Sequence, residues 1–248
     1  MPAQLVSIEV APDLVDQVHR VLLGAISSGA LAPGERITQE DIAQRLSVSR
    51  QPVLQALRLL KKDGFVRDAP GRGVLVAPLE AEAMRKVYQV RGALDVLAAR
   101  LAAEQRFRID ARLIERGRRA ARGRNVEAMI DADVAFHQAI YEASGNPLIG
   151  QSAALHWRHL RRAMGAVLQA EPQRESLWDE HEAIAEAIAA GHVERAARLS
   201  EEHVSQASEA LSERLSQQLA SAASAASAAS AASRSTPQTT PRKKGDKA

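Results

Sequence analysis

The spacing of apolar residues predicts two short helices and a β-hairpin in the first third of the chain. The apolar positions that recur at helical spacing are Ile42 and Leu46, followed by Val53, Leu57 and Leu60. The apolar residues then fall in two short runs, 65–66 and 74–76, which are typical of strands. The order helix, turn, helix, hairpin predicts a winged helix-turn-helix, in which the second helix enters the DNA major groove.

The residues at the ends of these helices agree with this prediction. Thr38 can cap the first helix, with Asp41 in the first turn where the helix dipole favours an acid. Ser49 is the predicted N-cap of the second helix, and Pro52 is tolerated within its first turn. Gly64 is a candidate C-cap, so we expect the second helix to end just before it.

Several fixed spacings between residues 31 and 76 resemble those of the GntR family of bacterial transcription regulators. The shared pattern is L-x-P-G, then V-S-R-x-P-V-x-x-A-L-x-x-L, then P-G-R-G at the hairpin tip. Gln51, Leu54 and Gln55 stand where Thr, Arg and Glu are common in the family. The resemblance implies a DNA-binding set made of Ser49, Arg50, Gln51, Leu54, Gln55, Arg58, Gly71 and Arg72. Because the arginine common at position 54 is replaced by leucine, the operator sequence does not follow from the family.

Positive charge is concentrated on the same segment. The stretch 45–72 holds seven Lys or Arg and two acids, whereas the whole chain has a net charge of +3. Such a cluster on the element expected to enter a groove is the electrostatic signature of phosphate binding. The alternative is an ordinary solvated helix face.

Composition limits the other classes of protein that this chain could represent. Its 248 residues suffice for two modest domains, and the aromatic content of 3% with abundant alanine favours packed helices over a β-sandwich. There is no cysteine, which excludes disulfides and thiolate metal sites. The sequence has neither an apolar run of membrane-spanning length nor a secretory signal, so we expect a cytoplasmic protein with no membrane partner.

Beyond residue 76 the pattern is helical throughout. Breaks at 145–147 and 191 separate the expected helices, which are 80–104, 109–122, 126–144, 147–170, 174–190 and 193–217. The predicted fold class is therefore mainly α, a winged helix-turn-helix domain over 8–78 joined to an all-α bundle over 79–217. Residues 218–248 contain a Ser-Ala-Ala repeat and a basic end, and we expect a disordered tail. Alanine could instead prolong the last helix.

Three of the seven histidines form a pattern with one aspartate. Asp133 and His137 are four residues apart, hence on one face of a helix. His181 and His203 lie at similar distances on either side of Gly191, so they would sit at similar height in an antiparallel helix pair. The four side chains could converge, although isolated histidines on helices are usually surface or satisfied polar residues. We interpret His19, His156, His159 and His192 in that way.

The second half of the chain resembles the FCD effector domain of FadR-type GntR regulators. The segments that resemble it are VRGALDVLAARLA from residue 90, DADVAFHQAI, SGNPLI and DEHEAIAEAIAAGHVERA, ending at His203. In metal-binding members, an Asp and a His four residues apart are joined by two histidines of the last two helices. The resemblance therefore implies that Asp133, His137, His181 and His203 hold a divalent ion. Three imidazoles and a carboxylate suit zinc first, and nickel or another borderline ion as alternatives.

The same resemblance implies a small carboxylate effector bound beside the metal and a cationic side chain. Arg91 on the first bundle helix is the first candidate for this cation, and Arg161 is a weaker one, as is Arg162. An equally good interpretation of Arg91 is an ion pair with Asp95, one turn further on.

Three functions fit these observations. The leading hypothesis is a dimeric repressor, not an enzyme, that binds an inverted-repeat operator on double-stranded DNA and responds to the effector. A DNA-targeted metalloenzyme would use the same His and Asp cluster to activate water, but no clear general acid or base accompanies it. A nucleoid-type basic protein would bind DNA through its tail and would leave the histidine set unexplained.

Overall fold

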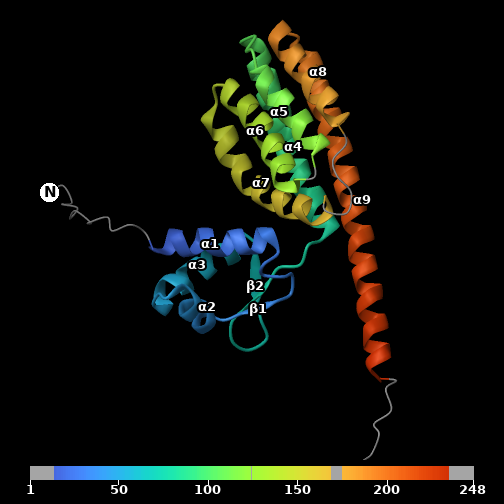
Figure 1. Cartoon of the computed structure of the whole chain (residues 1–248). Helices are drawn as coiled ribbons and strands as arrows, with labels where there is room; N and C mark the ends of the chain where they lie inside the picture. Colours follow the sequence, from blue (N-terminus) through green and yellow to red (C-terminus); the bar gives the residue numbers. More distant parts are fainter. Residues whose placement is uncertain (1–13, 124, 169–174, 235–248) are drawn as a thin grey trace, which may run out of the picture.

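Two hydrophobic cores organise the chain, one for each predicted domain (Figure 1). The structure is a computed structural model that describes residues 14–123, 125–168 and 175–234. The N-terminal domain consists of α1 (Leu14–Ser28), β1 (Arg36–Ile37), α2 (Gln39–Leu46), α3 (Arg50–Lys62), β2 (Val66–Asp68) and β3 (Val74–Val76). The C-terminal bundle consists of α4 (Ala81–Glu104), α5 (Ala111–Arg122), α6 (Val126–Ala143), α7 (Pro147–Val167), α8 (Leu177–Ala190) and α9 (Val193–Arg234).

The two predicted helices of the DNA-binding domain are present where expected. The Thr38 hydroxyl accepts a hydrogen bond from the Asp41 amide at 3.2 Å and so caps α2. Ser49 is the N-cap residue of α3, but its hydroxyl caps no backbone amide of the described helix. The Ser49 side chain is therefore available to a ligand at the exposed end of α3.

Two elements of this domain were not predicted. Helix α1 buries Val18, Leu22 and Ile26, which are spaced four residues apart, and it packs against α3. That spacing is a signal that the sequence contained. Strand β1 has only two residues, too few for a periodicity, and it forms because β3 offers it a partner.

The three strands form one antiparallel sheet in the order β1-β3-β2. The tip between β2 and β3 is held from β1, because the Arg36 guanidinium donates to the carbonyls of Pro70 at 2.7 Å and Arg72 at 3.2 Å. Gly73 has φ +87°, and a Cβ there would lie 2.4 Å from the Ile37 carbonyl oxygen. The tip therefore requires glycine at this position, which leaves the Arg72 side chain exposed on a braced wing.

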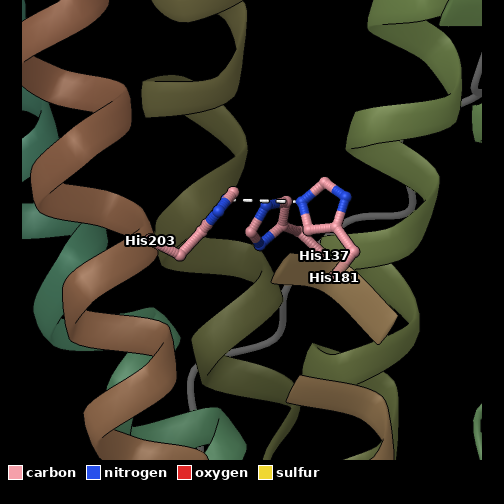
Figure 2. Close-up of side chains that lie close together, drawn as sticks. All are labelled: His137, His181 and His203. Carbon is pink, nitrogen blue, oxygen red and sulfur yellow. Dashed lines mark hydrogen bonds between the residues drawn. The ribbon is translucent and has the colours of Figure 1, made fainter. Parts of the chain in front are cut away.

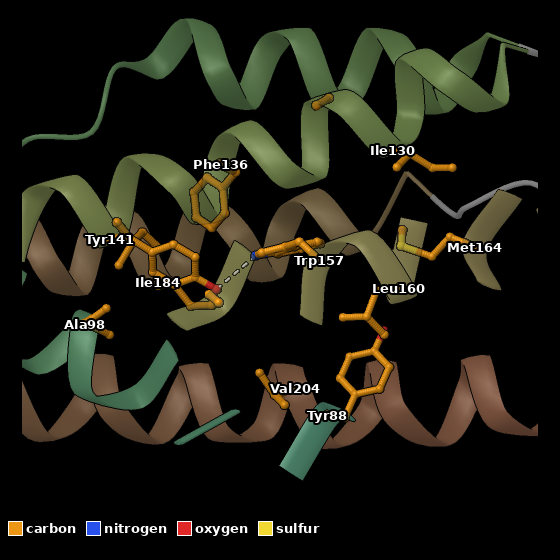
Figure 3. Packing of buried hydrophobic residues seen from close by; sticks show 14 of the residues in the cluster. Tyr88, Ala98, Ile130, Phe136, Tyr141, Trp157, Leu160, Met164, Ile184 and Val204 are labelled. Atoms are coloured by element: carbon orange, nitrogen blue, oxygen red, sulfur yellow. Dashed lines mark hydrogen bonds between the residues drawn. The ribbon is translucent and has the colours of Figure 1, made fainter. Parts of the chain in front are cut away.

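The bundle confirms the predicted helix order: the ends of α4 to α8 lie within a few residues of the prediction, whereas α9 runs 17 residues further than predicted. The predicted helix positions 169–170 and 174 lie outside the described residues. The helices α4 and α9 lie along each other, and Gly92 permits a close approach, because a Cβ there would lie 2.8 Å from the Val204 side chain of α9. Ala98, Ala99 and Ala102 of α4 are fully buried. Around them the larger side chains of Phe136, Tyr141 and Trp157 fill the core (Figure 3). The Trp157 indole donates to the Tyr141 hydroxyl at 3.1 Å, so its buried N–H is satisfied. Among the described residues no helix is long and apolar enough to cross a membrane.

The prediction of a disordered tail is wrong for residues 218–234, which continue α9 well past the bundle (Figure 1). Alanine favours this continuation because it loses little side-chain entropy in a helix. Leu215 is the last buried residue of α9, and the described side chains from Ser216 to Ala225 are exposed. The end of the predicted tail, 235–248, lies outside the described residues.

Deletion of residues 221–248 should leave folding and metal content unchanged. The described side chains at 221–225 are exposed, so the deletion removes no packing that the structure shows. It also removes five Lys or Arg against one acid, which should flatten the salt dependence of DNA binding. Melting temperature and DNA affinity at several salt concentrations measure both effects, and a large fall in melting temperature would contradict the prediction.

Candidate metal centre and DNA-binding face

Three histidines from three helices meet inside the bundle (Figure 2). His137 of α6, His181 of α8 and His203 of α9 are buried, and each offers a ring nitrogen within 4.8 Å of the other two. The Nε2 atoms of His181 and His203 are 3.3 Å apart. Two nitrogens that are each about 2.1 Å from one ion lie about 3.0–3.4 Å apart, so this pair has the separation of two ligands of one ion.

Asp133, the fourth predicted ligand, lies next to the three histidines that meet at this site. It lies one helical turn before His137 on α6, is buried, and places Oδ1 3.5 Å from the His181 Nε2. Asp133, Asp95 and Glu180 are the carboxylates around the three imidazoles, and Arg91 is the neighbouring cation. Burial raises the pKa of Asp133 and Asp95, so their charged forms are costly without a further cation nearby. A divalent cation beside them would favour the charged carboxylates.

Glu180 is a residue of the cluster that the sequence interpretation missed. Its Oε2 lies 2.8 Å from the His203 Nδ1. A carboxylate accepts, so Nδ1 of His203 donates, and the lone pair of His203 is on Nε2, toward His181. Metal-binding histidines commonly have such a carboxylate on the outer nitrogen. The available signal was the position of Glu180, directly before His181 in the sequence.

The environment keeps two of the three imidazoles neutral. Burial, together with the nearby charge of Arg91 and the other histidines, lowers the pKa of His137 and His181 well below the usual histidine value. The Nδ1 atom of His181 is buried and has no hydrogen-bond partner among the described residues. Neutral imidazoles are the form that coordinates a metal, so the donor set fits a borderline divalent ion such as zinc or nickel.

Arg91 occupies the centre of this site. Its Nη2 lies 2.8 Å from Asp95 Oδ2 and within 3.1 Å of both ring nitrogens of His137. The predicted ion pair with Asp95 is therefore present. The guanidinium also lies 4.0 Å from the Trp157 ring centroid. Burial is the largest single influence and lowers the pKa of Arg91, but the combined attraction of Asp95, Tyr141, Tyr88 and Asp133 outweighs it and raises this pKa, so Arg91 stays a cation.

A cavity of about 110 Å³ adjoins the cluster. Its lining includes Tyr88, Arg91, Asp133, Met164, His203 and Arg214. This volume is below the several hundred Å³ typical of sites for drug-sized ligands, and it matches a molecule of a few heavy atoms. Two candidate metal ligands and a buried guanidinium thus face one small space.

The structure does not bring Arg161 to this cavity. Arg161 is on the outer face of α7, where its Nη2 pairs with Asp131 Oδ1 at 2.5 Å, and it lines surface grooves instead. Arg162 is buried but donates to the Ala77 carbonyl at 2.6 Å, between the two domains. Of the three candidate arginines, Arg91 alone lines the cavity beside the histidines.

The predicted DNA-binding residues share one region of the N-terminal domain. Arg50 starts α3 with an exposed side chain, whose Nη1 lies 3.3 Å from Glu40 Oε1 of α2. Gln51 and Arg58 are exposed, Leu54 and Gln55 are half-buried, and Gly71 and Arg72 form the wing tip. A surface ion pair such as Arg50–Glu40 contributes little, so a base or phosphate can displace it.

Comparison with known proteins agrees with both domains. Residues 14–76 match the family described as bacterial regulatory proteins, gntR family, and residues 86–206 match the FCD domain. A winged helix joined to a helical sensor bundle defines a DNA-binding transcription regulator. The chain belongs to the GntR family of these regulators and carries an FCD domain.

Individual relatives support this assignment. The HTH-type transcriptional regulator LutR of Bacillus subtilis is 31% identical over 75% of this chain and 96% of its own length. YdhC of the same species, an uncharacterized HTH-type transcriptional regulator, is 30% identical over 52% of this chain and 60% of its own length. The solved structure of Escherichia coli McbR/YncC has the same fold, with a TM-score of 0.68 at 24% identity over 83% of this chain and 99% of its own.

These families and relatives are transcription regulators and not enzymes, which favours the regulator over the metalloenzyme hypothesis. The match to the FCD domain also gives a context for the histidine cluster, which a nucleoid-type protein would leave unexplained. The FCD domain is associated with metal binding, and the His137, His181 and His203 cluster has the donors for it.

Proposed function

We propose that this protein is a metal-containing repressor that releases its operator when a small carboxylate binds in the bundle. The observation that supports this most directly is the cavity on which Arg91, Asp133 and His203 converge. A regulator needs a site whose ligand binds two conformations with different affinity, and a cavity lined by residues of the five helices α4, α6, α7, α8 and α9 can provide it.

Asp133, His137, His181 and His203 are the residues that would hold the ion. As a Lewis acid, the bound metal would supply a coordination position for a carboxylate oxygen. Arg91 would contribute a charge-assisted hydrogen bond to the same ligand. The Arg91 Nε–H is buried and has no hydrogen-bond partner among the described residues, so one donor of this guanidinium is left for a ligand.

The size of the cavity favours acids of a few carbons over longer ones. Aliphatic chains would have to displace Met164, Val167 or Leu168, which line the apolar side of the cavity. We therefore place short hydroxy acids and dicarboxylates first among candidate effectors.

The experiment has two stages. An operator is selected from random double-stranded DNA with the full-length protein, and binding is then titrated with a panel of short carboxylates in zinc-loaded and chelator-treated protein. At least one acid should weaken operator binding only in the zinc-loaded protein. A reporter placed behind the operator should be repressed by the protein and released by that acid. If no acid in the panel alters binding, or if the response is the same without metal, the sensor proposal is wrong.

We also propose that the protein acts as a homodimer on an inverted repeat. An apolar stripe along α4 supports a second copy as the partner. It consists of Val87, Val90, Leu94, Leu97 and Leu101, whose alternating spacings of three and four residues are those of a coiled-coil seam. Val90 and Leu97 are exposed, and the other three are half-buried at the edge of the bundle core. The helix α4 directly follows the linker from the winged helix, so pairing along it would set the distance between two DNA-binding domains.

Substitution of Leu97 by Arg should convert the dimer into monomers. The Leu97 side chain is 42% exposed in the single chain, so an arginine at this position reaches solvent in the monomer. In the dimer the same charge would be buried without a partner in the apolar interface, which is unfavourable. Leu148→Arg, at a 63% exposed leucine of α7, is the matched control. Sedimentation velocity measures the outcome. A Leu97→Arg protein that remains dimeric would place the interface elsewhere.

A further inference from the structure

Helix α7 is part of the bundle and also contacts the winged-helix domain. Leu155 packs against the core of the winged helix. Three further residues of α7 contact that domain or its linker, at positions i+3, i+4 and i+7 from Leu155: Arg158, His159 and Arg162. Since these spacings define one helix face, α7 presents a continuous surface to the DNA-binding domain.

His159 makes the most specific of these contacts. Its ring stacks on Phe65 with the centroids 4.2 Å apart and the planes 1° from parallel. Its Nε2 lies 2.8 Å from the carbonyl oxygen of Asp63. A carbonyl only accepts, so Nε2 carries the proton and donates. Burial lowers the pKa of His159, and the neutral ring with a proton on Nε2 satisfies this contact.

The residues that His159 holds form the end of the helix predicted to read DNA. Asp63 is the C-cap of α3, and the last carbonyls of a helix lack partners within it. Gly64 follows with φ +80°, and Phe65 is fully buried, with its amide bonded to the Leu60 carbonyl at 2.8 Å. His159 therefore holds the rigid turn at the end of α3, and in this way it fixes the direction of that helix.

The opposite side of α7 faces the proposed sensor. Trp157, two residues before His159, lies over the Arg91 guanidinium at 4.0 Å, and Met164 and Val167 line the cavity. A shift of α7 caused at the cavity would therefore move His159 with it. Arg162 provides a second connection, from the same helix to the Ala77 carbonyl just after β3.

A small tilt of α3 at this contact produces a large displacement at the DNA-reading end of the helix. Helix α3 has 13 residues, so Arg50 lies about 18 Å from the His159 contact, and a tilt of about 10° would displace it by roughly 3 Å. That displacement exceeds the tolerance of a hydrogen bond to a base edge.

We propose that His159 is a positioning residue that fixes the orientation of the recognition helix and couples it to the bundle through α7. The proposal rests on the DNA-reading role of α3. It does not depend on the assignment of the metal site or of the effector.

The test uses full-length protein with His159→Ala, His159→Gln and the control His156→Ala, a substitution on the same helix at a half-buried histidine. The first readout is hydrogen exchange at the amides of 63–65, which needs no DNA. The His159→Ala protein should exchange there about tenfold faster, while the bundle amides and metal content stay unchanged. The glutamine variant, which retains a donor for the Asp63 carbonyl, should recover part of the protection.

The second readout is the ratio of affinities for the selected operator and for random DNA. In His159→Ala this ratio should fall about tenfold, because base contacts need the helix orientation and phosphate contacts do not. His156→Ala should leave it unchanged. A general loss of stability would lower both affinities together and would leave their ratio unchanged. Unchanged exchange or an unchanged ratio in both His159 variants would overturn the proposal.

Discussion

Replacing His181 with alanine is expected to remove the metal from the protein while most DNA binding remains. His181 is fully buried, and its Nε2 lies within 3.5 Å of both the His203 Nε2 and the Asp133 Oδ1, so it is at the centre of the proposed ligand set. Loss of an outer partner of a metal ligand typically costs 10–100-fold in affinity, and loss of a ligand itself should cost more. The effect on DNA binding should be small because the winged helix has a core of its own.

Metal analysis of protein purified without a histidine tag measures the first part, with about one ion per subunit expected in the wild type and almost none in the variant. His192→Ala, an exposed histidine two residues after α8, is the matched control and should keep its metal. Because His181 packs against Phe136 and Trp178, alanine also leaves a cavity. His181→Asn, a polar side chain of more similar size, separates loss of the ligand from loss of packing. A His181 variant that keeps a full complement of metal would show that the cluster is a buried polar network.

Acid should release this metal, but only at low pH. Protons compete with a metal for imidazole nitrogens, and burial holds the pKa of His137 and His181 well below the usual value. In the unfolded chain these histidines protonate near pH 6.5, whereas in the metal-free folded protein they do so at lower pH. At these two histidines the unfolded state therefore binds more protons in that interval, so their contribution to the stability of the metal-free protein should fall as pH drops below about 6.5. Burial raises the pKa of Asp95 and Asp133, and this acts in the opposite direction at lower pH. Melting curves of chelator-treated protein between pH 5 and 8 measure this. A melting temperature that does not change across the range would contradict it.

Replacing Arg50 with alanine should cost about 1–3 kcal/mol of operator binding and relax the sequence preference. Arg50 begins α3 with a 67% exposed side chain, at the helix end that enters the major groove in this fold. Its guanidinium can read a guanine, but the neighbouring Leu54 can only contact a thymine methyl. The loss should appear on the operator and be smaller on random DNA.

The control for this substitution is Arg85→Ala. Arg85 of the bundle helix α4 is also exposed and also pairs with a glutamate at 3.3 Å, but it lies outside the winged helix. Binding is measured on the selected operator and on a scrambled sequence at one salt concentration, since phosphate contacts vary steeply with salt. If the Arg50 variant binds the operator as tightly as the wild type, α3 is not the reading helix or Arg50 does not reach a base.

Local signals explain why so much of the fold was predictable. The cap at Thr38, the glycines at 64 and 73 and the breaks at 145 and 191 all act within a few residues of their own position. The sequence analysis does not predict α1, although the spacing of its buried residues is helical, and it predicts a tail for the Ser-Ala-Ala repeat because the repeat lacks large apolar side chains. At 221–225, the part of the repeat whose side chains are described, these side chains are exposed, so the intrinsic helix preference of alanine favours the helix there.

The sequence by itself determined the order of the elements, the basic recognition segment and the spacing that puts Asp133 and His137 on one helix face. The tertiary structure alone decided that three helices bring His137, His181 and His203 within 4.8 Å, and that Arg91 lines their cavity while Arg161 does not. It also decided that Glu180 orients His203, and that His159 stacks on Phe65, 94 residues away. The physical reason is the distance along the sequence over which each kind of interaction acts. Capping and periodicity act over one or two helical turns, whereas these contacts depend on how helices distant in sequence pack, which no local pattern encodes.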